Sequence, residues 1–121
     1  EVSALSFEQD FDFLSKAGYQ ALMHQKNGRM RPATFWKESR WQHIGAQHKD
    51  RTLITGFSRV DGPDKGKVVF VVNAHLTAGC NAGRRLRQVD DALKAVSKEA
   101  KKLDIDATVL PVLICGDFNS Q

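Results

Sequence analysis

The sequence contains little cysteine, proline or tyrosine: two cysteines, three prolines and one tyrosine in 121 residues. Cys80 and Cys115 lie far apart and have no metal-site spacing, which argues against a disulfide scaffold and against a cysteine zinc site. No apolar run approaches the roughly 20 residues of a membrane-spanning helix, and no signal peptide opens the chain. We therefore expect free thiols, no membrane span and an intracellular protein, cytoplasmic or nuclear.

The composition is that of one folded domain or a piece of one. The hydrophobic fraction of 41% is enough for a single core and too high for a disordered chain. The net charge of +4 favours polyanion partners such as nucleic acid, although a few extra solvated lysines explain it equally well. Because the first residue is Glu1 and not Met, we expect that both ends have been cut from a longer protein.

The first half of the sequence predicts one helix and two hairpins. Phe7, Phe11 and Leu14 fall on one helical face, and Gly18 is placed to end that helix. Four segments have alternating or β-rich patterns and predict strands: residues 19–25, 33–37, 52–60 and 67–76. Asn27-Gly28 suits the turn of the first hairpin, and "DGPDKG" suits the turn of the second. Residues 38–50 are polar, lack a clean period and predict a loop.

The second half predicts a long helix and a last strand. In residues 83–103 apolar side chains recur at three- and four-residue steps, which is typical of an amphipathic helix on a sheet. Those side chains are Leu86, Val89, Leu93, Val96, Ala100 and Leu103. Residues 109–115 predict a buried strand with Cys115 inside it. The element order predicts an α/β chain of the α+β type, with α and β layers and mixed strand directions.

Polar side chains close two of the predicted strands. Asn73 and His75 end one, and Asp117 and Asn119 follow the other; residues two apart on an extended chain face the same side. This set suits phosphoester hydrolysis: Asp117 would deprotonate water, Asn119 would bind the developing charge, and His75 would give a proton to a phosphate oxygen. Hard oxygen ligands would hold Mg²⁺.

Each of these residues also has a plainer interpretation. "GDFN" is a common strand-exit turn, and a lone histidine such as His75 is more often structural. The two clusters together weaken both alternatives. His24, His43 and His48 match no zinc spacing, and we expect them at the surface. The long helix carries many basic side chains that suit a nucleic-acid backbone, but interspersed acids favour a solvated face.

Three segments carry a family resemblance: "NAHL", the helix start "RRLRQ", and "PVLICGDFNS". Together they resemble the endonuclease/exonuclease/phosphatase superfamily, and within it the deadenylase–nocturnin branch, with Ala74 in place of the usual Thr. The resemblance spans Glu1 to Asn119. It implies that residues 1–121 are a single incomplete catalytic domain. The implied fold is a partial four-layer α/β sandwich with mixed, mainly antiparallel sheets, lacking N- and C-terminal strands.

The resemblance also implies roles for individual residues. Glu1 matches the glutamate that binds the metal, Mg²⁺ or alternatively Mn²⁺. Asn73 is a candidate for substrate binding beside His75. Arg31 and Arg40 are candidates for phosphate contacts, although exposed arginines are more often solvated surface.

The resemblance implies a Mg²⁺-dependent phosphodiesterase acting on RNA, most closely a 3′–5′ exoribonuclease of the deadenylase type. Two alternatives remain open. One is a phosphomonoesterase acting on an inositol phosphate, a nucleotide or a dinucleotide phosphate. The other is a catalytically inactive relative that binds RNA or protein. The sequence leaves the substrate, the number of metal ions and the oligomeric state open.

We predict that the 121-residue chain by itself does not turn over substrate at a useful rate. The family's first-strand Asn and its C-terminal Asp-His pair are absent from this sequence, and that histidine is central to the family's chemistry. Incubation of the purified chain with poly(A) and small phosphate esters tests this. Mg²⁺-dependent hydrolysis that disappears in Asp117→Ala would contradict the prediction.

Overall fold

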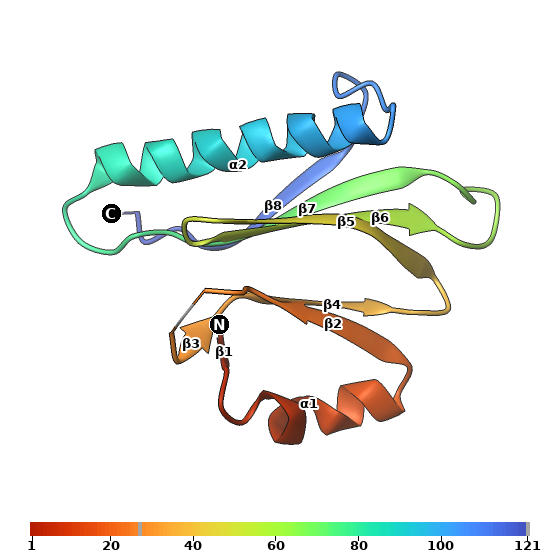
Figure 1. The fold of residues 1–121 in the computed structure, drawn as a ribbon, viewed down its shortest axis with the longest axis horizontal. Coiled ribbons are helices and arrows are strands. Elements are labelled where there is room, and N and C mark those ends of the chain that lie inside the picture. The colour runs from red at the N-terminus through yellow and green to blue at the C-terminus, as the bar shows by residue number, and fades with distance from the viewer. Residues whose placement is uncertain (27, 121) are drawn as a thin grey trace.

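The computed structural model describes residues 1–26 and 28–120, so Asn27 of the predicted turn lies outside the described residues. The elements stack in four layers: α1, a layer of short strands, a four-stranded sheet, and α2 (Figure 1). In chain order they are β1 (Val2–Ser3), α1 (Phe7–Lys16), β2 (Tyr19–Met23), β3 (Met30–Arg31), β4 (Ala33–Lys37), β5 (Trp41–Lys49), β6 (Thr52–Arg59), β7 (Val68–His75), α2 (Ala82–Lys102) and β8 (Val112–Asp117).

The strands pair as the predicted fold class requires. β1 pairs with β3, and β2 with β4, both antiparallel. The third sheet has the order β5-β6-β7-β8, in which only the β7–β8 pair is parallel. The mixed, mainly antiparallel character and the layered α/β arrangement are therefore confirmed. None of the helices in the described part of the chain is long and apolar enough to cross a membrane.

The main core lies between the four-stranded sheet and α2. Ile54, Phe70 and Val72 of the sheet pack against small side chains of the helix, Ala92 and Ala95 among them. The long helix is confirmed, but the predicted apolar stripe marks its buried side only in part: Val96 and Ala100 are buried, 4% and 0% exposed. The two leucines at its start and middle, Leu86 and Leu93, are 71% and 41% exposed. Alanines, not leucines, let the helix lie close to the sheet.

The polar segment 38–50, predicted as a loop, contains β5. A bulge between His43 and Gly45 interrupts its pairing with β6. A bulge adds one residue to one strand and shifts which side chains face the core. This shift removes the two-residue period that identifies a strand in a sequence, so the loop prediction was wrong for Trp41–Lys49.

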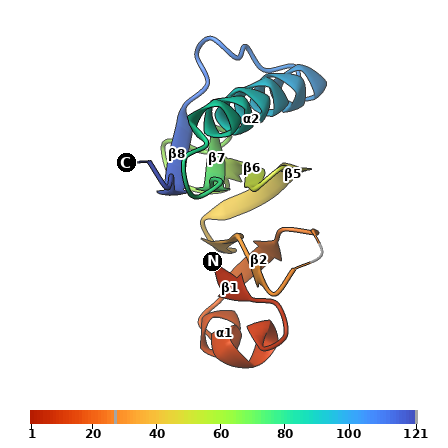
Figure 2. The ribbon, with the colours of Figure 1, turned by 90° about the vertical axis from the view of Figure 1, so that its left-hand side faces the viewer.

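The last strand, predicted to be buried, is exposed. β8 is the outer strand of its sheet, and in residues 1–26 and 28–120 no strand pairs with its free edge (Figure 2). Leu113 is 60% exposed and Ile114 is 40% exposed. Cys115 is also exposed, and it and Cys80 are free thiols, as predicted. The apolar composition of β8 reports its strand propensity and not burial in this structure.

Gly116 is the position in β8 where only glycine fits. Its φ of 134° lies in a region that other residues avoid. A Cβ there would lie 1.9 Å from the carbonyl oxygen of Ala74 in β7. The backbone of β7 therefore lies directly against this glycine.

We predict that Gly116→Ala lowers the free energy of unfolding by about 3 kcal/mol, because the clash with Ala74 and the forbidden φ act together. Urea unfolding followed by circular dichroism measures this change. Gly62→Ala is the matched control: its φ of 72° is also positive, but nothing lies within 4 Å of the added Cβ. The control should lose only about 1 kcal/mol, and equal losses in the two variants would refute the argument.

Candidate active site

His75 and Asp117 meet where β7 and β8 end. The parallel register pairs these two residues directly. The Nε2 atom of His75 lies 3.9 Å from Oδ2 of Asp117. The imidazole is mostly enclosed, with 18% of its side chain exposed, whereas the Asp117 carboxylate is 62% exposed. The Asp117 carboxylate is therefore open to solvent, and the His75 imidazole lies deeper in the fold.

Glu1 completes the group from the other half of the fold. It precedes β1, which pairs with β3. Its Oε1 lies 3.2 Å from Nε2 of His75. One imidazole nitrogen thus faces two carboxylates that come from opposite ends of the chain. The structure brings together the three residues that the sequence assigned to metal binding and proton transfer.

Asn119 is fixed beside Asp117 by hydrogen bonds. Its backbone N–H donates to Oδ1 of Asp117 (2.9 Å), and its side-chain Nδ2 donates to the carbonyl oxygen of Leu76 (2.7 Å). Its φ is 47°, a conformation that asparagine tolerates better than most residues. The second amide hydrogen is left for another acceptor. Asp117 and Asn119 line an open hollow of about 480 Å³, together with Gly79 and Gly116.

Asn73 is placed on the same side of β7 as His75, but its amide is occupied. Nδ2 donates to the carbonyl oxygen of Ala33 (2.8 Å) and to Oγ1 of Thr34 (3.2 Å). The side chain therefore joins the four-stranded sheet to β4. Its predicted role in substrate binding stays a prediction, and only its side-chain oxygen is free to serve it.

The two candidate arginines lie in different places. Arg31 pairs with Val2 next to Glu1, and its guanidinium donates to the carbonyl oxygens of Gly28 (2.9 Å) and His24 (3.4 Å). Arg40 precedes β5, at the end of the sheet opposite to His75, where its carbonyl oxygen accepts from Val60. The structure brings Arg31 near the site and does not bring Arg40 there.

Sequence reasoning missed two basic residues near the site. Arg51 donates from Nε to the carbonyl oxygen of His75 (2.7 Å). The pKa of Lys26 is lowered, first by burial and next by the Arg51 guanidinium, while Glu1 opposes this change. Arg51 lies in the turn between β5 and β6. Recognising that turn in the sequence would have pointed to Arg51, but residues 38–50 were predicted as a loop and not as a strand.

The helix start "RRLRQ" holds the loop that follows β7. Gln88 is 2% exposed; it accepts the backbone N–H of Thr77 (3.0 Å) and donates to Oδ2 of Asp50 (3.0 Å). This bond from Gln88 is the main cause of a lowered pKa at Asp50. Arg85 donates to the carbonyl oxygens of Thr77 and Gly79. These side chains therefore shape the wall of the hollow.

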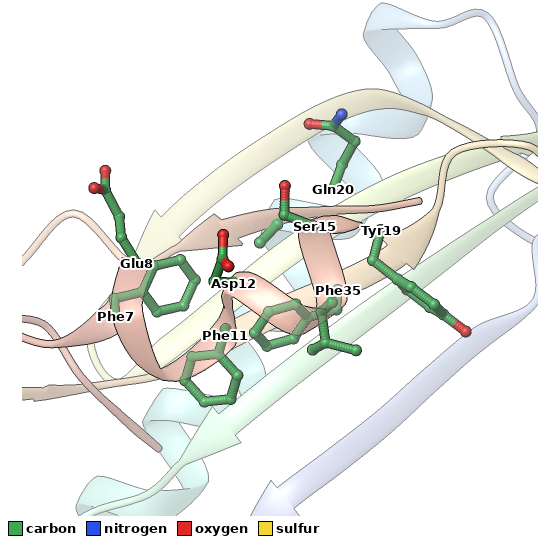
Figure 3. Close-up of a pocket in the computed structure, with 10 residues that line it drawn as sticks. Phe7, Glu8, Phe11, Asp12, Ser15, Tyr19, Gln20 and Phe35 are labelled. Carbon is green, nitrogen blue, oxygen red and sulfur yellow. The ribbon is translucent and has the colours of Figure 1, made fainter. Parts of the chain in front are cut away.

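A second hollow lies away from this group. It has a volume of about 350 Å³ and is lined by residues of α1, β2 and β4. Three phenyl rings line it, those of Phe7, Phe11 and Phe35 (Figure 3). No residue that the sequence singled out for chemistry lies in its wall, so it is separate from the candidate active site.

The carboxylate side chains near His75 are of the type that binds Mg²⁺. No group of three or more His, Cys, Asp or Glu side chains within residues 1–26 and 28–120 is arranged to hold a metal ion. Mg²⁺ needs fewer protein ligands, because it keeps several waters and binds through one or two carboxylates plus a substrate phosphate. Glu1 and Asp117, both facing His75, supply such carboxylates.

His24 and His48 form hydrogen bonds that join the N-terminal half of the chain to β5. His24 is buried, not at the surface as predicted; its Nε2 pairs with the carbonyl oxygen of Lys49 (2.7 Å), and its Nδ1 accepts the N–H of Lys26 (3.1 Å). Nδ1 of His48 accepts the N–H of Gln25 (3.2 Å). Burial lowers the pKa of His48, and His24 lowers it further.

No family model and no curated protein matches the chain, but solved structures do. The human nocturnin catalytic domain with bound sulfate matches with a TM-score of 0.69 and 20% identity, over 95% of this chain and 48% of that one. ANGEL2, a 2′,3′-cyclic phosphatase, in complex with adenosine-2′,3′-vanadate, matches with a TM-score of 0.78 and 22% identity, over 99% and 38%. An endonuclease/exonuclease/phosphatase family protein from Bacteroides thetaiotaomicron matches with a TM-score of 0.63 and 16% identity, over 98% and 47%.

These matches show the fold. The chain has the fold of the endonuclease/exonuclease/phosphatase proteins, as the resemblance implies. It spans less than half the length of each of these structures.

We predict that the free energy of unfolding falls between about pH 7.5 and pH 5, in part through His48. The unfolded imidazole binds a proton near its ordinary pKa of 6.5, and the folded one only at lower pH. The unfolded state therefore holds more protons in that interval, and the stabilisation present above pH 6.5 is lost on acidification.

His48→Asn tests the contribution of His48, because Oδ1 of asparagine can accept the N–H of Gln25 without titrating. Urea unfolding at both pH values should show a smaller pH dependence in this variant than in the unchanged chain. In the unchanged chain, loss of the hydrogen bond from Gln25 N–H to His48 costs about 1 kcal/mol. An unchanged slope would contradict the role assigned to His48.

Proposed function

We propose that this chain carries part of the active site of a phosphoric ester hydrolase, in which water attacks phosphorus. The observation that supports this most is the placement of His75 between the carboxylates of Glu1 and Asp117, 3.2 and 3.9 Å from its Nε2. Residues far apart in sequence converge there with the mix of acid, amide and imidazole groups that such chemistry uses. The same fold in a cyclic phosphatase supports the proposal.

In the proposed reaction the chain's own residues divide the work. Asp117, the most exposed of the three, takes the proton of the attacking water. Asn119 donates its free amide hydrogen to a phosphate oxygen, since its other hydrogen holds Leu76. His75 donates the N–H on Nε2, which faces Glu1 and Asp117, to the same phosphate.

Glu1 would hold Mg²⁺, with Mn²⁺ as a substitute, and Asp117 is near enough to assist. The bound ion would neutralise charge on the phosphate. Because the proposal assigns only one or two carboxylates to the ion, it requires that waters or the substrate complete the coordination.

For the substrate we propose RNA, cleaved from its 3′ end as in the deadenylases. The basic net charge of +4 and the fold shared with the nocturnin catalytic domain support this choice. The second candidate is a small nucleotide phosphate ester, which the higher TM-score to the ANGEL2 complex with adenosine-2′,3′-vanadate favours. We assign the reaction, on whichever of these two substrates, to a longer polypeptide that contains this chain.

We predict that Asp117→Asn reduces hydrolysis by the parent polypeptide roughly 10²- to 10⁴-fold, the usual contribution of a general base. Poly(A), a 2′,3′-cyclic nucleotide and nucleotide monophosphates, assayed in parallel with Mg²⁺ and with Mn²⁺, identify the substrate class. Asp64→Asn, which removes an exposed acid in a turn far from His75, is the matched control and should keep full activity.

Binding by the 121-residue chain provides a second readout that needs no turnover. Amide NMR titration with Mg²⁺ should perturb Val2 and residues 117–119, and Glu1→Gln should abolish this response while Glu8→Gln leaves it intact. Inorganic phosphate should then perturb Asn119. If the parent hydrolyses no ester and the chain binds neither ion, the proposal is refuted and the inactive binding relative is favoured.

A further inference from the structure

Arg51 has an unusual backbone conformation directly beside His75. With Asp50 it forms the two-residue turn between β5 and β6, where Lys49 pairs with Thr52. Its φ is 58°, in the left-handed region that favours glycine, asparagine or aspartate. The backbone alone therefore disfavours arginine here, and its side chain makes contacts that none of those smaller residues would make.

Arg51 and His75 are joined by three contacts. The carbonyl oxygen of Arg51 accepts the N–H of His75 (2.9 Å), and Nε of Arg51 donates to the carbonyl oxygen of His75 (2.7 Å). Nη2 of Arg51 then lies 3.3 Å from Nδ1 of the imidazole. The guanidinium thus contacts both the backbone and the imidazole ring of His75.

This arrangement determines which ring nitrogen carries the proton. A guanidinium has only donors, so Nδ1 of His75 must present its lone pair to Nη2. In the neutral ring the proton is then on Nε2. That nitrogen faces the carboxylates of Glu1 and Asp117, at 3.2 and 3.9 Å, and their negative charge favours an N–H over a lone pair there. The contact with Arg51 and the two carboxylates therefore favour the same tautomer.

We propose that Arg51 is a positioning residue that holds His75 as the Nε2–H tautomer, aimed into the candidate active site. The inference rests on the proposed function, in which His75 donates to a phosphate oxygen. A neutral ring held this way has no lone pair on Nε2 and does not take a proton from water there, which leaves that task to Asp117.

The turn itself is fixed from the opposite side of the sheet. Asp50 accepts hydrogen bonds from Arg84 (3.2 Å) and from the buried Gln88 (3.0 Å) of α2. Adjacent residues of one turn thus bind α2 on one side and His75 on the other. This anchor gives Arg51 a defined position from which to orient the ring.

Arg51→Gly and Arg51→Lys in the 121-residue chain test the proposal. The glycine variant removes the side chain and also relieves the positive φ, so the turn should persist. Side-chain ¹⁵N spectra recorded where the ring is neutral report the tautomer, and His75→Gln identifies the His75 signals. The unchanged chain should show a single Nε2–H form. In Arg51→Gly the Nδ1 signal should shift to the position of a nitrogen without a hydrogen bond.

A Glu1→Gln background makes the effect of Arg51 easier to detect, because glutamine donates or accepts and imposes no tautomer, while Asp117 stays 3.9 Å from Nε2. There, Arg51→Gly should produce a measurable Nδ1–H form that is absent from Glu1→Gln alone, and Arg51→Lys should restore part of the Nε2–H preference. Arg59→Ala, which removes an arginine at the far end of β6, is the matched control and should leave the His75 signals unchanged.

The results separate this inference from the proposed function. An Nδ1–H form in the unchanged chain, or a His75 spectrum that Arg51→Gly leaves unaltered, would overturn the role of Arg51 even if the parent hydrolyses phosphate esters. In the parent, Arg51→Gly should lower kcat more than it raises KM. A held tautomer in a parent that cleaves no ester would support the ring geometry and refute the hydrolase.

Discussion

The parallel pairing of β7 with β8 is the constraint on which the candidate active site depends. It sets His75 opposite Asp117 and makes both strands end at the same edge. A parallel pair needs a long crossover, and α2 provides it on one face of the sheet. The other face is then open to the N-terminal half, from which Glu1 reaches the same histidine. Gly116 permits the close approach of the two strands at this point.

The alternation of side chains along β7 divides structural work from chemistry. Phe70 and Val72 face α2 and form the main core, whereas Asn73 and His75 face the N-terminal half. Asn73 uses its amide to hold β4, so it fixes the distance between the two sheets. The position of Glu1 relative to His75 depends on that distance. A residue predicted to bind substrate therefore contributes to the site through the packing of the sheets.

Much of this arrangement could be predicted from the sequence, because it is encoded in short-range patterns. The strand-end pairs around His75 and Asp117 follow from two-residue spacing, and the long helix follows from its period. What failed depends on tertiary context. The bulge in β5 erases the strand pattern, and close packing selects alanines over Leu86 and Leu93. The contact of Arg51 with His75 could not be predicted, because it forms only when the turn after β5 brings the two residues together.

The charges around the site explain why a cation belongs in the proposed mechanism. Three basic groups, Lys26, Arg31 and Arg51, lie near the site, and Arg31 and Arg51 already donate to backbone carbonyl oxygens. Glu1 and Asp117 oppose them at the point where a phosphate would meet His75. At that point the two carboxylates repel an anionic ester locally, and a divalent ion would offset this repulsion. In the proposed arrangement, the Nε2–H of His75 adds a further donor to an anion held beside the acids.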